Sequence, residues 1–195
     1  MLKLNLLETR TRLLDAAELL FQEHGYRAVS MADIAAATGI RKASLYHHVP
    51  GGKEELSVEV SARAFGRHYA GLTKVLGHAE GGLEPQLRAA SGWFIAHAPL
   101  RLLATLQNDM PALTSEHVAE LEAELFKNLW SPLRTVFVLA SERGEIRASA
   151  PDTWVGAFLS LMDGLTYFGT SNPQTQIMEE AADELITMMV KGLAP

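Results

Sequence analysis

A cationic segment without acidic residues runs from Ile34 to Lys53. It contains Arg41, Lys42 and two histidines, and no aspartate or glutamate. The chain carries a net charge of −6, all of which arises in residues 57–195, because residues 1–56 hold seven basic and seven acidic residues. Salt screens charges beyond about 8–10 Å, so attraction to phosphate is decided locally. The segment is therefore a candidate nucleic-acid-binding surface.

No other residues form a recognisable catalytic or metal-binding constellation. The chain has no cysteine, which excludes a thiol nucleophile, a disulfide framework and a cysteine-rich zinc site. The remaining histidines lack metal-ligand spacing with a carboxylate partner; they are His24, His68, His78, His97 and His117. Because no acid–base or nucleophilic groups converge, we expect no enzymatic activity, no metal and no cofactor.

Helices must position the cationic segment, because apolar residues recur every three or four positions and no period of two persists. The first three expected helices span 9–24, 31–37 and 41–49. Gly25 ends the first helix in a left-handed turn. Ser30 can cap the second in a capping box with Asp33. Gly39 gives the turn before the third helix its backbone freedom, and Pro50 is a strong stop.

The rest of the chain is also predicted to be helical. A long helix is expected from Lys53 to about Leu76, and later helices are expected at 83–97, 100–108, 115–143, 152–168 and 174–191. We predict an all-α fold of about nine helices, with a helix-turn-helix domain at 1–55 and a larger ligand-sensing and dimerisation domain at 56–195.

The segment from Thr11 to Leu56 resembles the DNA-binding domain of the TetR/AcrR regulators. The resemblance rests on an Ala-Ala-x-x-Leu-Phe helix, a Gly-Tyr joint and the Asp-Ile-Ala-x-x-x-Gly-Ile core, followed by Ala-Ser-Leu-Tyr-His-His and Lys-Glu-Glu-Leu. Two features depart from the family pattern. Val49 stands where the family usually has phenylalanine, and the loop before Lys53 is one residue longer, owing to the Gly51-Gly52 pair.

The third helix would read DNA in a major groove about 12 Å wide. Arg41 and Lys42 open it and can reach base edges, Ala43 can contact a thymine methyl, and Ser44 can donate to a base or phosphate. By resemblance, Tyr46 and His47 lie against the sugar–phosphate backbone, and Lys53 holds a phosphate with the start of the next helix. Ser30, foremost an N-cap, can add a DNA contact.

A ligand cavity is expected in the second domain, because Pro132 should kink the helix at 115–143 and open space beside it. The residues predicted to line it are aromatic or apolar with a few polar groups. They are Trp93, His97, Gln107, Met110, Phe126, Trp130, Phe137, Trp154, Phe158 and Met162. For each residue, plain core packing is the alternative.

A homodimer is expected to form through the last two helices. Small residues recur every four positions on the first of them, and an apolar stripe follows the second. The predicted interface residues are Gly156, Ser160, Gly164, Met178, Ala182, Leu185 and Met189. The resemblance implies that these helices pair with their copies in a four-helix bundle, and two recognition helices about 34–36 Å apart would then read a palindrome.

These features predict a cytoplasmic repressor that leaves a palindromic operator in double-stranded DNA when it binds a small, largely apolar or aromatic effector. No apolar run approaches the roughly 20 residues of a membrane span, so no membrane partner is expected. Two alternatives stay open at this point. One is an all-helical enzyme, and the other is a protein-interaction module, each with an incidental helix-turn-helix resemblance.

Overall fold

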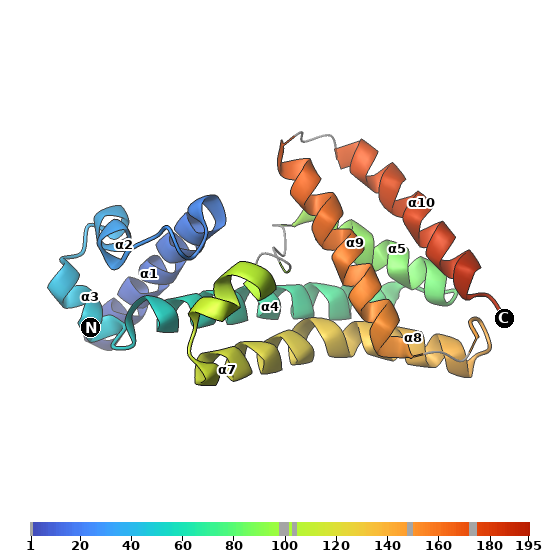
Figure 1. The fold of residues 1–195 in the computed structure, drawn as a ribbon, viewed down its shortest axis with the longest axis horizontal. Coiled ribbons are helices and arrows are strands. Elements are labelled where there is room, and N and C mark those ends of the chain that lie inside the picture. Colours follow the sequence, from blue (N-terminus) through green and yellow to red (C-terminus); the bar gives the residue numbers. More distant parts are fainter. Residues whose placement is uncertain (1, 98–101, 103–104, 148–149, 172–174) are drawn as a thin grey trace. The chain divides into compact units, whose positions relative to one another are not determined.

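The computed structural model describes residues 2–97, 102, 105–147, 150–171 and 175–195. Within these residues there are nine α-helices and no strand. The helices are α1 (Leu2–His24), α2 (Met31–Thr38), α3 (Lys42–His48), α4 (Gly52–His78), α5 (Leu83–Ala96), α7 (Ser115–Leu125), α8 (Ser131–Glu142), α9 (Pro151–Ser171) and α10 (Thr175–Leu193) (Figure 1). Three short helical segments join them: η1 (Thr105–Asp109), η2 (Met110–Ala112) and η3 (Phe126–Trp130).

The predicted all-α class is confirmed, and most predicted helices agree with the observed ones to within a few residues. The first helix begins earlier, at Leu2 rather than Thr9. The helix predicted at 100–108 lies largely outside the described residues, and its last part, η1, is a π-helical turn. No described helix is long and apolar enough to cross a membrane.

The chain divides into two compact units. The first comprises 1–64 and 105–124, and the second comprises 65–104 and 125–195. The predicted boundary after residue 55 lies inside the first compact unit, and the predicted division into two functional domains stays a prediction. Helix α4 contributes residues to both units.

The core of the first unit fixes α2 and α3 on α1 and α4. Its fully buried side chains are Leu13, Ala17, Ile34, Leu45, Val49 and Leu56. Burying each leucine or isoleucine favours the folded state by about 1.5–3 kcal/mol. Because these residues come from all four helices, the short helices α2 and α3 are stabilised by packing rather than by length.

Local signals set the ends of α2. The Ser30 hydroxyl accepts from the Asp33 backbone N–H (3.3 Å), and the Asp33 carboxylate accepts from the Ser30 backbone N–H (2.8 Å), so the predicted capping box is confirmed. Gly39 follows the helix with φ of 69°, and its N–H donates to the carbonyls of Ala35 and Ala36. A side chain would be strained in this left-handed turn, which explains the glycine.

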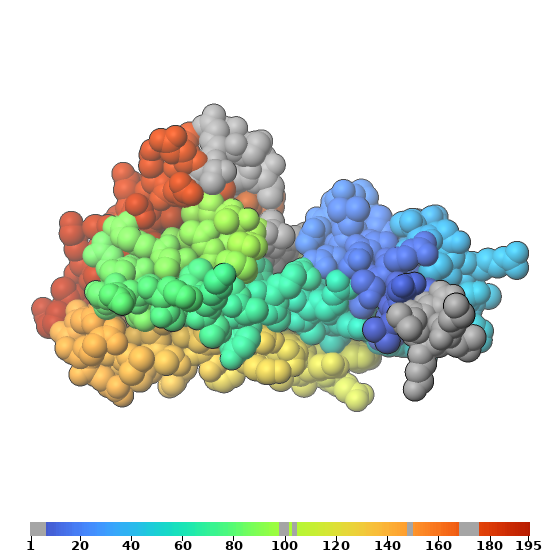
Figure 2. Space-filling view, turned by 180° about the vertical axis from the view of Figure 1, so that it is seen from behind, coloured from blue at the N-terminus to red at the C-terminus, as the bar shows by residue number. Residues whose placement is uncertain are grey.

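The second unit is a helical bundle in which α5 packs against α9 and α10, and α8 packs against α5 and α9. Its core contains the fully buried rings of Phe94, Phe137 and Phe158. Figure 2 shows α5 and the second half of α4 side by side on one face of this unit.

The kink predicted at Pro132 takes the form of a π-helical turn, η3, directly before it. Proline has no N–H to donate to the carbonyl of Asn128. A widened turn accommodates the missing hydrogen bond and lets the helix resume as α8.

Helix α4 approaches α5 closely at Gly71. A Cβ built on Gly71 would lie 1.9 Å from Cζ2 of Trp93, so the indole ring rests directly on the α4 backbone. The ring is held there by stacking on His97, with ring centroids 3.4 Å apart, and by an indole N–H that donates to His68 Nδ1 (3.2 Å). A glycine is therefore required for this packing.

Gly71→Ala should lower the free energy of unfolding by about 1–3 kcal/mol, because the added methyl displaces a fixed ring. Gly66→Ala, in the same helix, is the matched control. A Cβ at Gly66 meets nothing within 4 Å, so this change should stabilise the protein by up to about 1 kcal/mol through helix propensity. Urea denaturation measures both. Stabilisation by both substitutions would contradict the close packing of Trp93 on α4.

Candidate nucleic-acid interface

Helix α3 is anchored by few residues and exposes the rest. Leu45 and Val49 are fully buried. The six predicted DNA-contacting residues between positions 41 and 47 lie exposed around them: Arg41, Lys42, Ala43, Ser44, Tyr46 and His47. The structure therefore brings these six predicted residues together on one exposed surface.

Arg41 and Lys42 differ from the other lysine and arginine side chains that the structure describes in the first unit. Among side chains that the structure describes, neither forms an ion pair or a hydrogen bond, and both are exposed. The others donate to protein oxygens; they are Arg10, Arg12, Arg27, Lys53 and Arg63. Among the described side chains of this unit, the uncommitted positive charge is thus concentrated at the start of α3, beside small residues that allow close approach.

Two of the arginines that donate to protein oxygens contact the ends of the short helices α2 and α3. Arg12 Nη2 donates to the Thr38 carbonyl at the end of α2 (2.8 Å). Arg10 donates to the His48 carbonyl at the end of α3 and pairs with Glu55 and Glu59 of α4. The Glu59 carboxylate, ahead of the opposing effect of burial, raises the pKa of Arg10. Sequence reasoning missed both roles, because the partners lie 26 to 49 residues away.

Lys53 does not present the free ammonium that the resemblance implied. Its Nζ donates to the carbonyls of Tyr26 and Val29, both at 3.0 Å, and lies 4.2 Å from the centroid of the Tyr26 ring. An ammonium has three donors, and these contacts occupy it. In the structure, Lys53 joins the loop before α2 to the start of α4, and its predicted phosphate contact stays a prediction.

Lys53→Met should destabilise the protein by about 2 kcal/mol, because two backbone carbonyls lose their charged donor. A hydrogen bond from a charged group contributes about 1.5–3 kcal/mol when buried, and the partial exposure of Lys53 reduces this contribution. Thermal and urea denaturation measure the loss. Lys42→Met is the matched control, since that ammonium has no partner within the described chain, and should change stability by less than about 0.5 kcal/mol. If the two variants were equally stable, the contacts of Lys53 within the chain would not stabilise the fold, and its role would lie in external contacts alone.

Ser30 is exposed, but its hydroxyl is engaged in the cap. It accepts from the Asp33 backbone and donates to the Asp33 carboxylate (2.7 Å). These bonds, the side-chain one first, lower the pKa of Asp33. A DNA contact by Ser30 stays a prediction.

A second tie within the first unit joins residues far apart in the sequence. Glu54 accepts from the Thr114 backbone N–H, and one of its oxygens lies 3.1 Å from His117 Nδ1. The Thr114 N–H, followed by His117, lowers the pKa of Glu54. Arg27 Nε donates to the Asn108 carbonyl (3.2 Å). These contacts hold 105–124 beside the helix-turn-helix, and no sequence pattern indicated them.

The residues predicted to line an effector cavity occupy several environments. Gln107 and Met110 belong to the first unit, and the other eight belong to the second. In the second unit, Phe158 and Met162 are fully buried in the core. Trp130 donates from Nε1 to Asp152 (2.7 Å). A cavity common to the predicted set stays a prediction.

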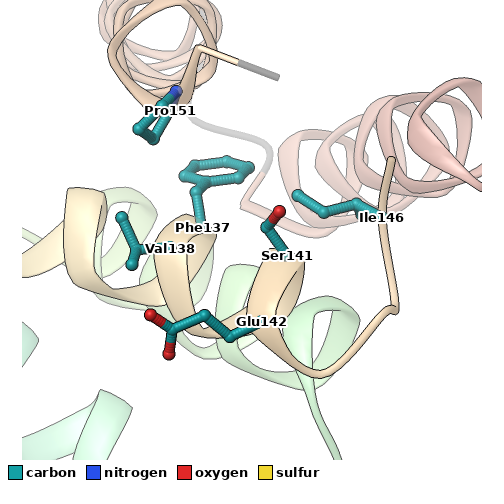
Figure 3. Close-up of a pocket in the computed structure, with 6 residues that line it drawn as sticks. All are labelled: Phe137, Val138, Ser141, Glu142, Ile146 and Pro151. Carbon is teal, nitrogen blue, oxygen red and sulfur yellow. The ribbon is translucent and has the colours of Figure 1, made fainter. Parts of the chain in front are cut away.

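Two further predicted residues line separate hollows of the second unit. Phe126 lies in an open groove that is described below. Phe137 lines a cavity of about 200 Å³, where its ring lies between Pro151 and Ser141 while Glu142 extends away from it (Figure 3). This cavity is below the 300–1,000 Å³ typical of ligand pockets.

Two predicted dimer residues pack within the chain itself, and the predicted interface as a whole stays a prediction. A Cβ on Gly156 would meet Trp130 at 3.3 Å, so the glycine makes room for that ring. Ala182 is fully buried in the bundle. Ser160 is exposed, and a Cβ at Gly164 would meet nothing within 4 Å. Met178, Leu185 and Met189 are partly exposed.

The structure offers no alternative metal chemistry in the part that it describes. No group of three or more histidine, cysteine, aspartate or glutamate residues there is arranged to hold a metal ion.

Comparison with known proteins identifies relatives of the first unit by sequence. Residues 13–68 match the family described as "Bacterial regulatory proteins, tetR family". The HTH-type transcriptional regulator LmrA of Bacillus subtilis is 44% identical over 52 residues, which are 27% of this chain and 28% of LmrA. The HTH-type transcriptional repressor KstR2 of Rhodococcus jostii is 59% identical over 39 residues, 20% of this chain and 19% of KstR2. The chain thus matches less than a third of the length of these relatives.

The fold comparison extends over nearly the whole chain. AibR, solved in complex with isovaleryl coenzyme A and operator DNA, superposes with a TM-score of 0.74 at 25% identity. The superposition covers 96% of this chain and 98% of AibR. The family match is therefore confined to residues 13–68, whereas the fold match covers nearly the whole chain.

Proposed function

We propose that the chain is a transcriptional regulator of the TetR family, not an enzyme, and that it binds double-stranded DNA through α3. The observation that carries this proposal is the pair of uncommitted cations, Arg41 and Lys42, at the start of an exposed helix in a unit whose other described basic side chains are engaged.

The proposed contacts follow the exposed surface of α3. Arg41 pairs with a guanine edge, and Lys42 binds a base or phosphate. Ala43 and Ser44 face the bases, and Tyr46 and His47 lie against the sugar–phosphate backbone. Phosphate contacts fix the register and base contacts supply the specificity.

We propose that two copies bind a palindromic operator. One recognition helix reads too few base pairs for a specific site, and a twofold pair about 34–36 Å apart doubles the contacts. Ser160 and Gly164 on α9, with partly exposed residues of α10, are the proposed interface.

The proposed regulation is repression that a small, largely apolar or aromatic effector relieves. The relative KstR2 is named a repressor, and AibR was solved with both an acyl coenzyme A and operator DNA. An effector that binds the DNA-free state more tightly by a few kcal/mol would suffice to shift operator occupancy. This function requires access to the chromosome, so we propose a cytoplasmic location.

Selection of duplexes from a random pool tests the proposal, followed by measurement of the mass of the free protein. We expect an enriched inverted repeat and a mass of twice the 21.3 kDa chain. A protein that enriches no sequence, or that stays monomeric at the concentrations used, would overturn it.

A further inference from the structure

An open groove crosses the second unit between α4, α5, η3 and α8. Its volume is about 760 Å³, within the 300–1,000 Å³ of small-molecule sites. Twelve residues line it: Tyr69, Thr73, Leu76, Gly77, Gln86, Phe126, Lys127, Ser131, Pro132, Thr135, Val136 and Leu139. Figure 2 shows the surface of α4 beside that of the η3–α8 segment. The groove lies beside Pro132, where the sequence predicts a cavity, but only Phe126 of the predicted lining residues belongs to it.

The groove contains several exposed apolar side chains, which is unusual for a protein surface. Tyr69, Phe126 and Leu139 are 44%, 55% and 41% exposed, respectively, and all three lie in this one groove. Isolated exposed apolar side chains are normal, whereas a cluster in a concave surface is typical of a binding site. The walls suit a flat ring system or a branched chain.

A buried polar atom in the wall lacks a partner. Gln86 Oε1 is buried and forms no hydrogen bond with any described residue. Leaving such an atom unpaired is costly, and native proteins do so rarely. Because Gln86 lines the groove, a ligand with a donor or acceptor could pair with its amide after a rotation of the side chain.

One cation lines the groove, and it also interacts with another residue of the chain. Lys127 is the only charged residue among the twelve, and no carboxylate lines the groove, although the chain carries a net charge of −6. Phe126 and Lys127 are the first two residues of the π-helical turn η3. Such turns occur frequently at functional sites, because the extra residue redirects neighbouring side chains.

We propose that this groove binds an amphipathic organic anion, with its apolar body on Tyr69, Phe126 and Leu139, a hydrogen bond to Gln86 and its anionic end at Lys127. Binding to the groove is independent of the proposed DNA-binding function. The role of the ligand as an effector rests on that function.

Titration with 1-anilinonaphthalene-8-sulfonate tests the site, because this probe combines an aromatic body, an N–H donor and a sulfonate. Its neutral analogue N-phenyl-1-naphthylamine lacks the sulfonate. We expect Phe126→Ala to weaken both probes at least tenfold in a fluorescence titration of the full chain. We expect Lys127→Gln to weaken the sulfonate at least fivefold and to change the neutral analogue less than twofold.

Two matched controls remove comparable surface elsewhere. Leu19→Ala deletes a side chain that is 56% exposed on α1, and Lys191→Gln neutralises an exposed lysine on α10. Both should change either affinity less than twofold. Equal loss in the controls, or no loss in the groove variants, would overturn the site.

The effector role is measured on the operator selected with the wild-type protein. Saturating sulfonate probe should weaken operator binding at least tenfold for the wild type and less than threefold for Phe126→Ala. A wild-type protein that selects no operator refutes the proposed function and leaves the groove result standing. If operator affinity stays the same when the probe is bound in the groove, only the effector role is refuted.

Discussion

Replacing Arg41 and Lys42 together by alanine should lower affinity for the selected operator by about 100-fold, while affinity for unrelated duplexes falls far less. A bidentate arginine–guanine pair discriminates by about 1–3 kcal/mol, and a tenfold change corresponds to about 1.4 kcal/mol. Each lost phosphate contact should also reduce the slope of log affinity against log salt by about one. Fluorescence anisotropy at several salt concentrations measures both quantities.

The double substitution should leave the fold intact, which makes this loss interpretable. Neither side chain has a partner within the described chain, so the free energy of unfolding should change by less than about 0.5 kcal/mol. Lys74→Ala with Lys191→Ala is the matched control, because it removes the same charge from exposed positions outside the first unit. If the control weakened binding as much as the α3 variant, general electrostatics rather than α3 would account for the affinity.

The first three helices could be predicted because their signals are local. The capping box joins Ser30 to Asp33, three residues later. The turn after α2 needs one residue in the left-handed conformation, and Gly39 supplies it. Burial of Leu45 follows from helical spacing. Such features depend on neighbours in the chain, and a sequence displays them directly.

The environment of Lys53 could not be predicted, because it depends on partners far along the chain. The ammonium reaches the carbonyls of Tyr26 and Val29, which are 27 and 24 residues away. A cation that looks available in the sequence is thereby committed, whereas Arg41 and Lys42 are not. The same limit applies to Gln86, whose unpaired oxygen depends on how α5 packs.

The second unit contains a buried histidine that should make stability depend on pH. His68 on α4 is 6% exposed and accepts from the Trp93 indole N–H at Nδ1 (3.2 Å). Burial, with smaller contributions from Arg67 and His97, lowers the pKa of His68 to about 4 from 6.5. An acceptor nitrogen carries no proton, so protonation would break this hydrogen bond as well as place a charge in the core.

Lowering the pH from about 6.5 to about 4 should therefore destabilise the protein by about 3 kcal/mol through His68 alone. In this window the unfolded chain binds a proton that the folded chain does not, so protonation favours unfolding, and the lost stability returns as the pH rises above 6.5. Urea denaturation across the window measures the dependence. His68→Gln keeps an acceptor for the Trp93 indole but cannot titrate, so its unfolding free energy should depend on pH less steeply by this amount. His78→Gln, at an exposed position later in α4, should keep the wild-type slope. If His68→Gln and the wild type lost stability in parallel, the pH dependence would arise elsewhere, and His68 would titrate as an ordinary histidine.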